Sequence, residues 1–119
     1  MSCKKGDIVV VRFPFVLKNG REGQKGRPAM VISDDKAKRR YKDVILSAIT
    51  SHVPDDVMEF EMIIGSKRGT GLLKRSLLRL DFIMTVPEEL ISRKIGELSH
   101  NKLRQAERKL KKLLEINSN

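Results

Sequence analysis

Arg27 and the pair Arg79 and Asp81 are the residues whose types and spacing best suit chemistry on a phosphate group. Arg27 precedes Pro28 at the start of an apolar segment, where the proline restricts the backbone beside a guanidinium that can bind two phosphate oxygens at once. Arg79 and Asp81 lie two positions apart in LLRLDF, so in a strand their side chains share a face. Asp81 could accept a proton while Arg79 neutralises a phosphate, although a plain ion pair explains this spacing equally well.

Histidines and paired acids offer weaker candidate sites. His52 carries the imidazole that most often acts as a general base, but a surface histidine explains it better, as it does His100. Acidic pairs at 34–35 and 55–56 lie in loops and are better explained as turn residues than as Mg²⁺ ligands. The sequence therefore predicts neither a metal nor another cofactor.

The charge of the chain indicates an anionic partner. The 119 residues include 25 Lys and Arg against 15 Asp and Glu, which gives a net charge of +10 and a pI near 10.1. Nucleic acid, an anionic membrane surface and an acidic protein all fit this charge. No apolar stretch has the length of a transmembrane segment or signal peptide, so we expect a soluble, cytoplasmic protein without a membrane partner.

Scarce residue types limit the possible functions further. The lone Cys3 cannot form an internal disulfide, and together with two histidines it cannot complete a tetrahedral zinc site. The chain has one Tyr, four Phe and no Trp, so few rings are available for stacking on bases. Any recognition of RNA is expected to rely on charge and hydrogen bonds.

Apolar and β-branched segments predict up to six strands. They cover residues 8–15, 28–33, 43–50, 58–65, 72–85 and 92–99. Glycines and basic residues over 16–28 predict a long loop, SKRGTG predicts a second basic loop, and TVPEE predicts a short helical turn. Short strands without alternating strand-helix units indicate a β-rich α+β fold. We expect one domain over residues 1–119, a small, SH3-like, partly open antiparallel β-barrel with a C-terminal α-helix.

The predicted helix covers residues 100–116, with Ser99 as its N-cap. Its apolar face carries Leu103, Ala106, Leu110, Leu113 and Leu114. Its other face carries Lys102, Arg104, Arg108, Lys109, Lys111 and Lys112. These basic side chains could contact phosphates, but a solvated helix surface explains them better.

Five segments in a fixed order identify a family resemblance. GDIVVVRFPF, a glycine-rich loop, KGRPAMVIS, ILSAITS and the segment from GLLKRSLLRLDF to KIGELS together resemble the MazF/PemK-like toxins of toxin–antitoxin systems over roughly residues 5–116. The resemblance implies a compact β-barrel with a terminal helix that works as a homodimer. It also implies metal-independent endoribonuclease activity on single-stranded RNA, including mRNA, at preferred short sequences. A cognate antitoxin would block this activity.

The resemblance also assigns roles to individual residues. Thr50 matches a strand-end threonine that orients the scissile phosphate, and Ser51 is a weaker candidate for the same contact. Arg79 and Asp81 match an arginine and an acid that some PemK-like members use as a catalytic pair, and Arg27 would stabilise the phosphate. Further RNA-binding candidates lie in the two basic loops, at Arg21, Lys25, Lys67 and Arg68.

Two other functions stay open at this point. A toxin of the same architecture could act without catalysis by binding DNA gyrase, and a nucleic-acid-binding domain could use its charge without regard to sequence. An acidic or amphipathic antitoxin segment could cover Arg27 in either kind of toxin. Apolar side chains at Ile64, Leu72 and Leu73 are expected to be exposed and could form the dimer contact.

Overall fold

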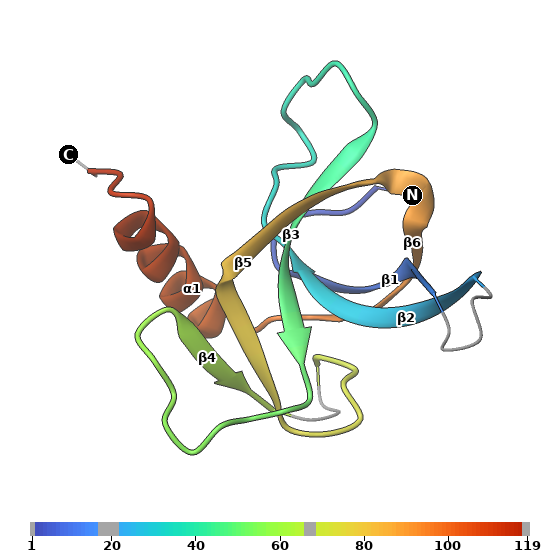
Figure 1. Ribbon diagram of the computed structural model, residues 1–119. Helices are drawn as coiled ribbons and strands as arrows, with labels where there is room; N and C mark the ends of the chain where they lie inside the picture. Colours follow the sequence, from blue (N-terminus) through green and yellow to red (C-terminus); the bar gives the residue numbers. More distant parts are fainter. Residues whose placement is uncertain (1, 17–21, 66–68, 118–119) are drawn as a thin grey trace.

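The computed structural model describes residues 2–16, 22–65 and 69–117, with the backbone alone at 13–16 and 22–25. The strands are β1 (Asp7–Val16), β2 (Glu22–Val31), β3 (Asp43–Thr50), β4 (Glu61–Ile64), β5 (Ser76–Pro87) and β6 (Ile91–Glu97). A 3₁₀ turn, η1 (Glu88–Leu90), joins β5 to β6, and helix α1 (His100–Leu113) ends the chain (Figure 1).

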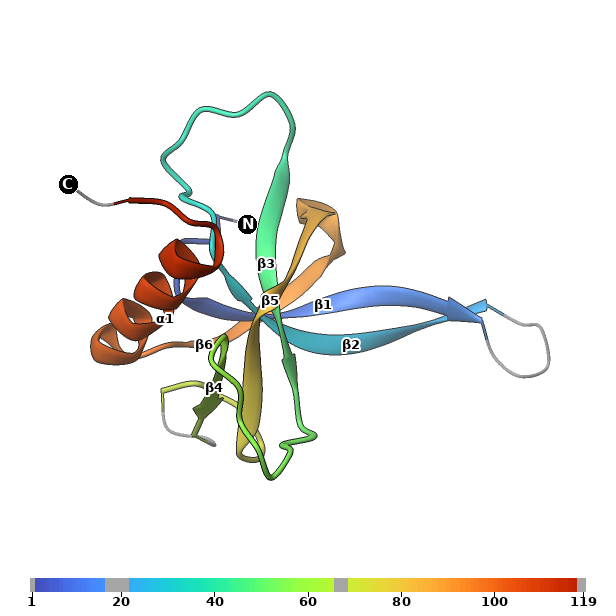
Figure 2. The ribbon, with the colours of Figure 1, turned by 60° about the vertical axis from the view of Figure 1, so that its left-hand side comes forward.

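The strands form one antiparallel sheet in the order β4-β5-β3-β2-β1-β6. The sheet is curved but not closed, since β4 and β6 stand at its two ends and are not paired with each other in the described residues. Strands β1 and β2 project beyond their neighbours as a long ribbon (Figure 2), while α1 lies beside β4 and β5 (Figure 1). This confirms the predicted fold, a partly open β-barrel with a C-terminal helix.

The predicted loop over residues 16–28 was wrong for its second half, because β2 already begins at Glu22. Its pairing with β1 runs from Val16↔Glu22 to Ile8↔Met30. The glycines that suggested a loop are tolerated because the apolar β1 offers a complete pairing edge, and strand preference depends strongly on such neighbours. At Gly26 an added Cβ would lie 2.8 Å from a methyl carbon of Val10, so a larger residue would require the Val10 side chain to shift.

Strand β4 is shorter than the predicted 58–65. Met58 is 64% exposed, and the strand begins only at Glu61. The carboxylate of Glu61 accepts a hydrogen bond from the backbone N–H of Met58 at 2.8 Å, while the N–H of Glu61 donates to the carbonyl of Met58. This local turn uses the N–H and carbonyl groups of Met58, which a longer strand would need for hydrogen bonds to its neighbour. Strand β5 likewise begins at Ser76, four positions after the predicted start.

The buried side chains form two clusters. One joins Ile8, Met30, Leu78 and Leu80 of the sheet to Ala106 of α1. The other includes Val9, Val11, Val31, Leu46 and Val86, which come from β1, β2, β3 and β5. Ile8 enters the first cluster, whereas Val9 and Val11 enter the second, as the two-residue period of a strand requires when both faces are covered.

Helix α1 begins as predicted at its Ser99 cap, whose side-chain oxygen accepts a hydrogen bond from the N–H of Lys102 at 3.3 Å. Leu103 and Leu110 pack against the first cluster. The predicted place of Leu114 on the apolar face was wrong: the helix ends at Leu113, and Leu114 is exposed. Among the described residues, no helix is both long and apolar enough to cross a bilayer.

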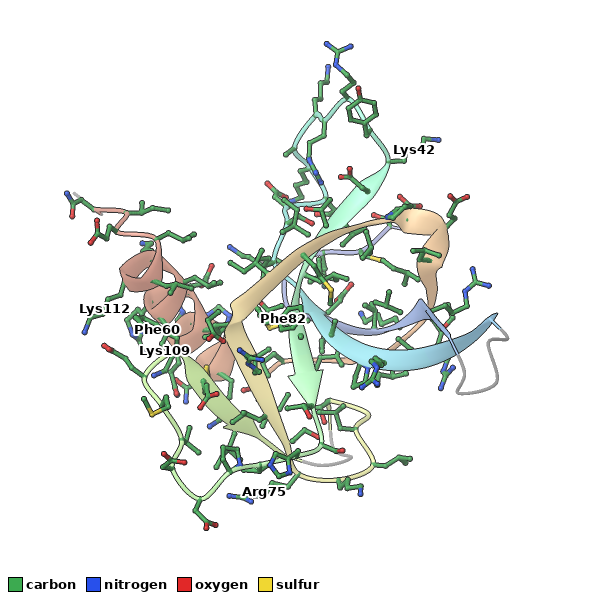
Figure 3. The ribbon with its side chains drawn as sticks, viewed as in Figure 1. Lys42, Phe60, Arg75, Phe82, Lys109 and Lys112 are labelled. Atoms are coloured by element: carbon green, nitrogen blue, oxygen red, sulfur yellow. The ribbon has the colours of Figure 1, made fainter. Side chains whose placement is uncertain are left out.

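Two lysines of the basic face of α1 have a structural partner. Lys109 donates to the backbone carbonyl of Glu59, and Lys112 forms an ion pair with the Glu59 carboxylate. Figure 3 shows both lysines beside Phe60, at the connection that leads into β4. These contacts hold α1 against the sheet edge.

The start of β1 is tied to β6 through a buried carboxylate. Asp7 is 2% exposed, accepts a hydrogen bond from the backbone N–H of Lys4 at 3.0 Å and forms an ion pair with the Lys94 ammonium at 3.2 Å. This contact with the Asp7 carboxylate raises the pKa of Lys94 above its usual value. Burial, together with the carboxylates of Asp7 and Glu88, raises the pKa of the nearby Cys3 thiol.

Strand β5 contains a bulge at its centre. Ser47 of β3 pairs with Ile83, but the next residue, Ala48, pairs with Arg79. Residues 80–82 of β5 therefore have no opposite partners on β3, and the β5 ribbon bends sharply (Figure 1). Bulges of this kind turn side chains away from the direction that regular pleating would give them.

Candidate functional site

An open groove lies where the end of β3 meets the loop that leads into β5, and we call it the basic groove. It has a volume of about 420 Å³. Its polar lining consists of Arg27, Thr50, Ser51, Lys74, Ser76 and Arg93. Residues from β2, β3, β6 and the loop before β5 thus converge on one surface hollow.

The floor of the basic groove follows from the register of three neighbouring strands. Val10 of β1 pairs with Pro28 on one side and with Arg93 on the other. Residues opposite each other in antiparallel strands point to the same face, so Arg93 and Pro28 flank Val10 and all three line the groove. Pro28 lies just beyond Ala29, where the pairing between β2 and β3 ends.

Glycine is required where the loop before β5 approaches β6. Gly71 has a φ of +72°, and a Cβ there would lie 1.9 Å from the carbonyl oxygen of Ile95. A Cβ at Gly96 would lie 2.3 Å from the carbonyl oxygen of Gly69. This close backbone contact holds the loop that brings Lys74 to the groove.

The two predicted residues Arg27 and Thr50 meet at the basic groove, and Ser51 lies with them. The Arg27 side chain is exposed. The hydroxyl oxygen of Thr50 accepts a hydrogen bond from the backbone N–H of His52 at 3.2 Å, which leaves its proton available for a ligand. His52 itself is exposed and does not line the groove.

The predicted pair Arg79 and Asp81 is also formed, but at a different place. A guanidinium nitrogen of Arg79 lies 3.3 Å from a carboxylate oxygen of Asp81, and both side chains are partly exposed. Neither residue lines the basic groove. The guanidinium carbon of Arg79 also lies 5.3 Å from the centre of the Phe82 ring.

A second hollow adjoins the basic groove, and we call it the apolar hollow. It has a volume of about 340 Å³ and is lined by Arg27, Pro28, Ala48, Ile49, Thr50, Phe82 and Met84. Arg27 and Thr50 therefore stand at the boundary between the two hollows.

Several predicted residues have a different status. Arg21, Lys67 and Arg68 lie outside the described residues, as does the side chain of Lys25. Of the apolar side chains expected at a dimer contact, Leu73 is 86% exposed, but Ile64 and Leu72 are buried in the first cluster. The expectation that these two are exposed was wrong, because β4 and the loop before β5 pack inward.

Lys74, Ser76 and Arg93 line the groove but were not predicted. Lys74 and Ser76 follow the basic loop directly, and this position next to a strand start was an available signal. Arg93 gave no such signal, because its place depends on the pairing of β6 with β1 across most of the chain.

The electrostatics of the basic groove favour an anion. None of Arg27, Lys74 and Arg93 forms an ion pair with a carboxylate of the described residues. The described lining of the groove also contains no carboxylate and no imidazole. Within residues 2–16, 22–65 and 69–117, no group of three His, Cys, Asp or Glu side chains could hold a metal ion. The groove can bind phosphate oxygens through cations and hydroxyl groups.

Solved structures share the fold described above. The structure "MazE-MazF (Form-II) from Deinococcus radiodurans" has a TM-score of 0.76 and 19% identity, covering 98% of this chain and 99% of that chain. The Mycobacterium tuberculosis toxin MazF-mt6 has a TM-score of 0.71 and 18% identity, covering 94% and 99%. A mycobacterial "endoribonuclease in complex with its cognate antitoxin" has a TM-score of 0.72 and 15% identity, covering 98% of each chain.

The sequence comparisons show the family. A search of curated proteins gave no match. In contrast, the family model described as "PemK-like, MazF-like toxin of type II toxin-antitoxin system" matches residues 4–114, which is nearly the whole chain. The protein therefore belongs to the PemK-like, MazF-like toxins of type II toxin–antitoxin systems.

Proposed function

We propose that the chain is a single-domain, cytoplasmic toxin that cleaves single-stranded RNA, including mRNA, at preferred short sequences without a metal ion. The observation that carries this proposal is the basic groove, where Arg27, Lys74 and Arg93 stand without carboxylate partners in the described residues beside the hydroxyl group of Thr50. Such a group of cations binds a phosphate backbone, and the family membership points to RNA.

The proposed reaction uses a nucleophile that RNA itself supplies. A ribose 2′-hydroxyl oxygen attacks the adjacent phosphorus and gives its proton to water, while the bond to the 5′-oxygen breaks and that oxygen takes a proton from water. Negative charge develops on the phosphate oxygens in the five-coordinate transition state, where preorganised donors stabilise it. Arg27 can donate two hydrogen bonds to these oxygens, and Thr50 can donate one through its free proton.

For Arg79 and Asp81 we propose the alternative that the sequence left open, an ion pair within β5. Both side chains contact each other and lie outside the lining of the groove. The groove would then contribute mainly through stabilisation of charge, and less through proton transfer by a side chain of this chain.

Two protein partners belong to the proposal. Relatives of the same fold are described as MazE-MazF and as an endoribonuclease with its cognate antitoxin. We propose that an antitoxin segment with acidic side chains covers the basic groove, because it would meet the same cations that are proposed to bind RNA. A homodimer is proposed from the family resemblance, and the exposed Leu73 next to the groove is suited to such a contact.

A cleavage assay in chelator tests the activity. Purified protein is incubated with a long, unstructured RNA, beside Arg27→Ala and the matched variant Arg40→Ala, whose exposed side chain lies in the loop between β2 and β3. We expect discrete fragments from the wild type and from Arg40→Ala. Arg27→Ala should cleave about 10²- to 10³-fold more slowly, with an unchanged melting temperature.

Two outcomes of the same assay would contradict the proposal. Intact RNA in every lane, at protein concentrations that bind RNA, would reject the nuclease and leave a non-catalytic toxin or a sequence-blind binder. Equal cleavage by wild type and Arg27→Ala would support the nuclease activity but would show that the basic groove is not its site.

A further inference from the structure

Phe82 presents an aromatic ring to solvent next to the basic groove. It is 46% exposed although β5 is an internal strand of the sheet, between β4 and β3. It lies in the segment 80–82 that has no partners on β3, so the bulge accounts for the outward direction of the ring. Figure 3 shows Phe82 where β5 and β3 run side by side, well away from Phe60 and the lysines of α1.

The ring forms one wall of the apolar hollow. Pro28, Ala48, Ile49 and Met84 supply the other apolar walls, and Arg27 and Thr50 supply the polar side. The volume of about 340 Å³ falls within the roughly 300–1,000 Å³ that is typical of pockets for small ligands. A flat apolar group that is joined to an anion would satisfy both sides of this hollow.

We infer that the apolar hollow binds the base of a nucleotide that flanks the phosphate held by Arg27, with the base stacked on Phe82. This inference rests on the proposed function. A base is linked to its phosphate through one ribose, and Arg27 and Thr50 line both the groove and the hollow. Every base has a π-face that can stack on an aromatic side chain, and the apolar walls would exclude water from the stacked base.

Arg79 is a positioning residue in this arrangement. Its guanidinium carbon lies 5.3 Å from the Phe82 ring centre, and its nitrogen lies 3.3 Å from the Asp81 carboxylate. A cation over a ring is attracted by the negative face of the ring. The ion pair thus holds Arg79 over one face of Phe82 and leaves the other face for a base.

The test uses short RNA oligonucleotides that contain one preferred cleavage site. In two derivatives, the nucleotide on the 5′ or on the 3′ side of the scissile phosphate is replaced by an abasic ribose. We expect wild type to cleave one of the two derivatives at least about tenfold more slowly than the intact oligonucleotide. Phe82→Leu should cleave the intact RNA more slowly and should show no difference in rate between the intact and the abasic oligonucleotides. Phe82→Trp and the matched variant Phe60→Leu should keep this difference in rate.

A binding measurement makes the result independent of cleavage. A 2′-deoxy nucleotide on the 5′ side of the scissile phosphate removes the attacking hydroxyl group and blocks the reaction. At the position where the abasic ribose slows cleavage, the base is replaced by 2-aminopurine. If wild type cleaves nothing, each flanking position in turn carries the 2-aminopurine. We expect its fluorescence to be quenched on binding to wild type and not on binding to Phe82→Leu.

Three results would overturn the inference. If both abasic derivatives are cleaved as fast as the intact RNA, the hollow binds no base and only the nuclease remains. If Phe82→Leu changes the monomer–dimer equilibrium in light scattering but keeps the base dependence, the hollow is a contact between copies of the chain. If wild type cleaves no RNA and 2-aminopurine is not quenched, both the inference and the proposed function fail.

Discussion

Arg27 of β2 and Thr50 of β3 both line the basic groove and the apolar hollow. They are not paired with each other, because the pairing of β2 with β3 ends at Ala29 and Ala48. From this position we expect Thr50 to act through its hydroxyl group alone. Thr50→Val keeps the shape and the strand preference of the side chain but removes its donor. We expect cleavage to fall about 10- to 100-fold, with Thr50→Ser close to wild type. Equal rates for both variants in single-turnover assays would exclude this donor.

Lys74 and Arg93, which have no carboxylate partner among the described residues, should determine how RNA binding depends on salt. Each phosphate contact that is removed lowers the slope of log affinity against log salt by about 0.7 for single strands. Lys74→Ala and Arg93→Ala should therefore weaken binding and flatten this slope, while the exposed Lys38→Ala should not. Fluorescence anisotropy over a series of salt concentrations measures both quantities. Unchanged slopes would place the RNA backbone elsewhere.

Asp81→Asn distinguishes the two roles that the sequence allows for the pair with Arg79. Since both side chains are partly exposed and outside the groove, we expect cleavage of RNA within about tenfold of wild type and a loss of stability of at most about 1 kcal/mol. A loss of 10²- to 10⁴-fold with a changed pH profile would instead identify Asp81 as the proton acceptor. The pH dependence of the cleavage rate decides between them.

The contact of Lys94 with Asp7 makes a pH-dependent contribution to stability. Because the pKa of Lys94 is raised in the folded protein, this contribution is complete below the unfolded value of about 10.4 and is lost as the pH rises through the raised value. Near neutral pH, Lys94→Met should lower the free energy of unfolding by about 1 kcal/mol, a modest value because the ammonium is partly exposed.

Urea denaturation of Lys94→Met at neutral pH and above pH ~10.4 measures this effect, with Lys38→Met as the matched exposed lysine. The difference between the two variants should shrink at the higher pH. A difference that stays constant across this range would mean that packing of the Lys94 stem, and not its charge, stabilises the start of β1.

The sequence alone predicted those parts of the fold that local patterns determine. Residues 43–50 and the Ser99 cap were correct to the residue, because an apolar run and a capping side chain act over a few positions. Arg27 and Thr50, which meet at the groove, both lie next to such recognisable segments.

Other parts depend on contacts that no local pattern contains. The glycines near Gly26 suggest a loop, yet the partner strand β1 holds them in β2. Arg93 reaches the groove only because β6 returns to pair with β1, and Phe82 faces outward only because β3 and β5 shift their register. Each of these features is decided when distant strands pair, so the residue type gives no sign of it.

The bulge in β5 makes the position of Phe82 independent of the strand pairing on either side of it. Pairing with β3 resumes on either side of residues 80–82, at Arg79 and at Ile83. A change of residue type at Phe82 would reshape the apolar hollow while the flanking strands kept their partners. The bulge thus gives the sheet one position where the wall of this hollow can change without any new loop and without altering the cations of the groove.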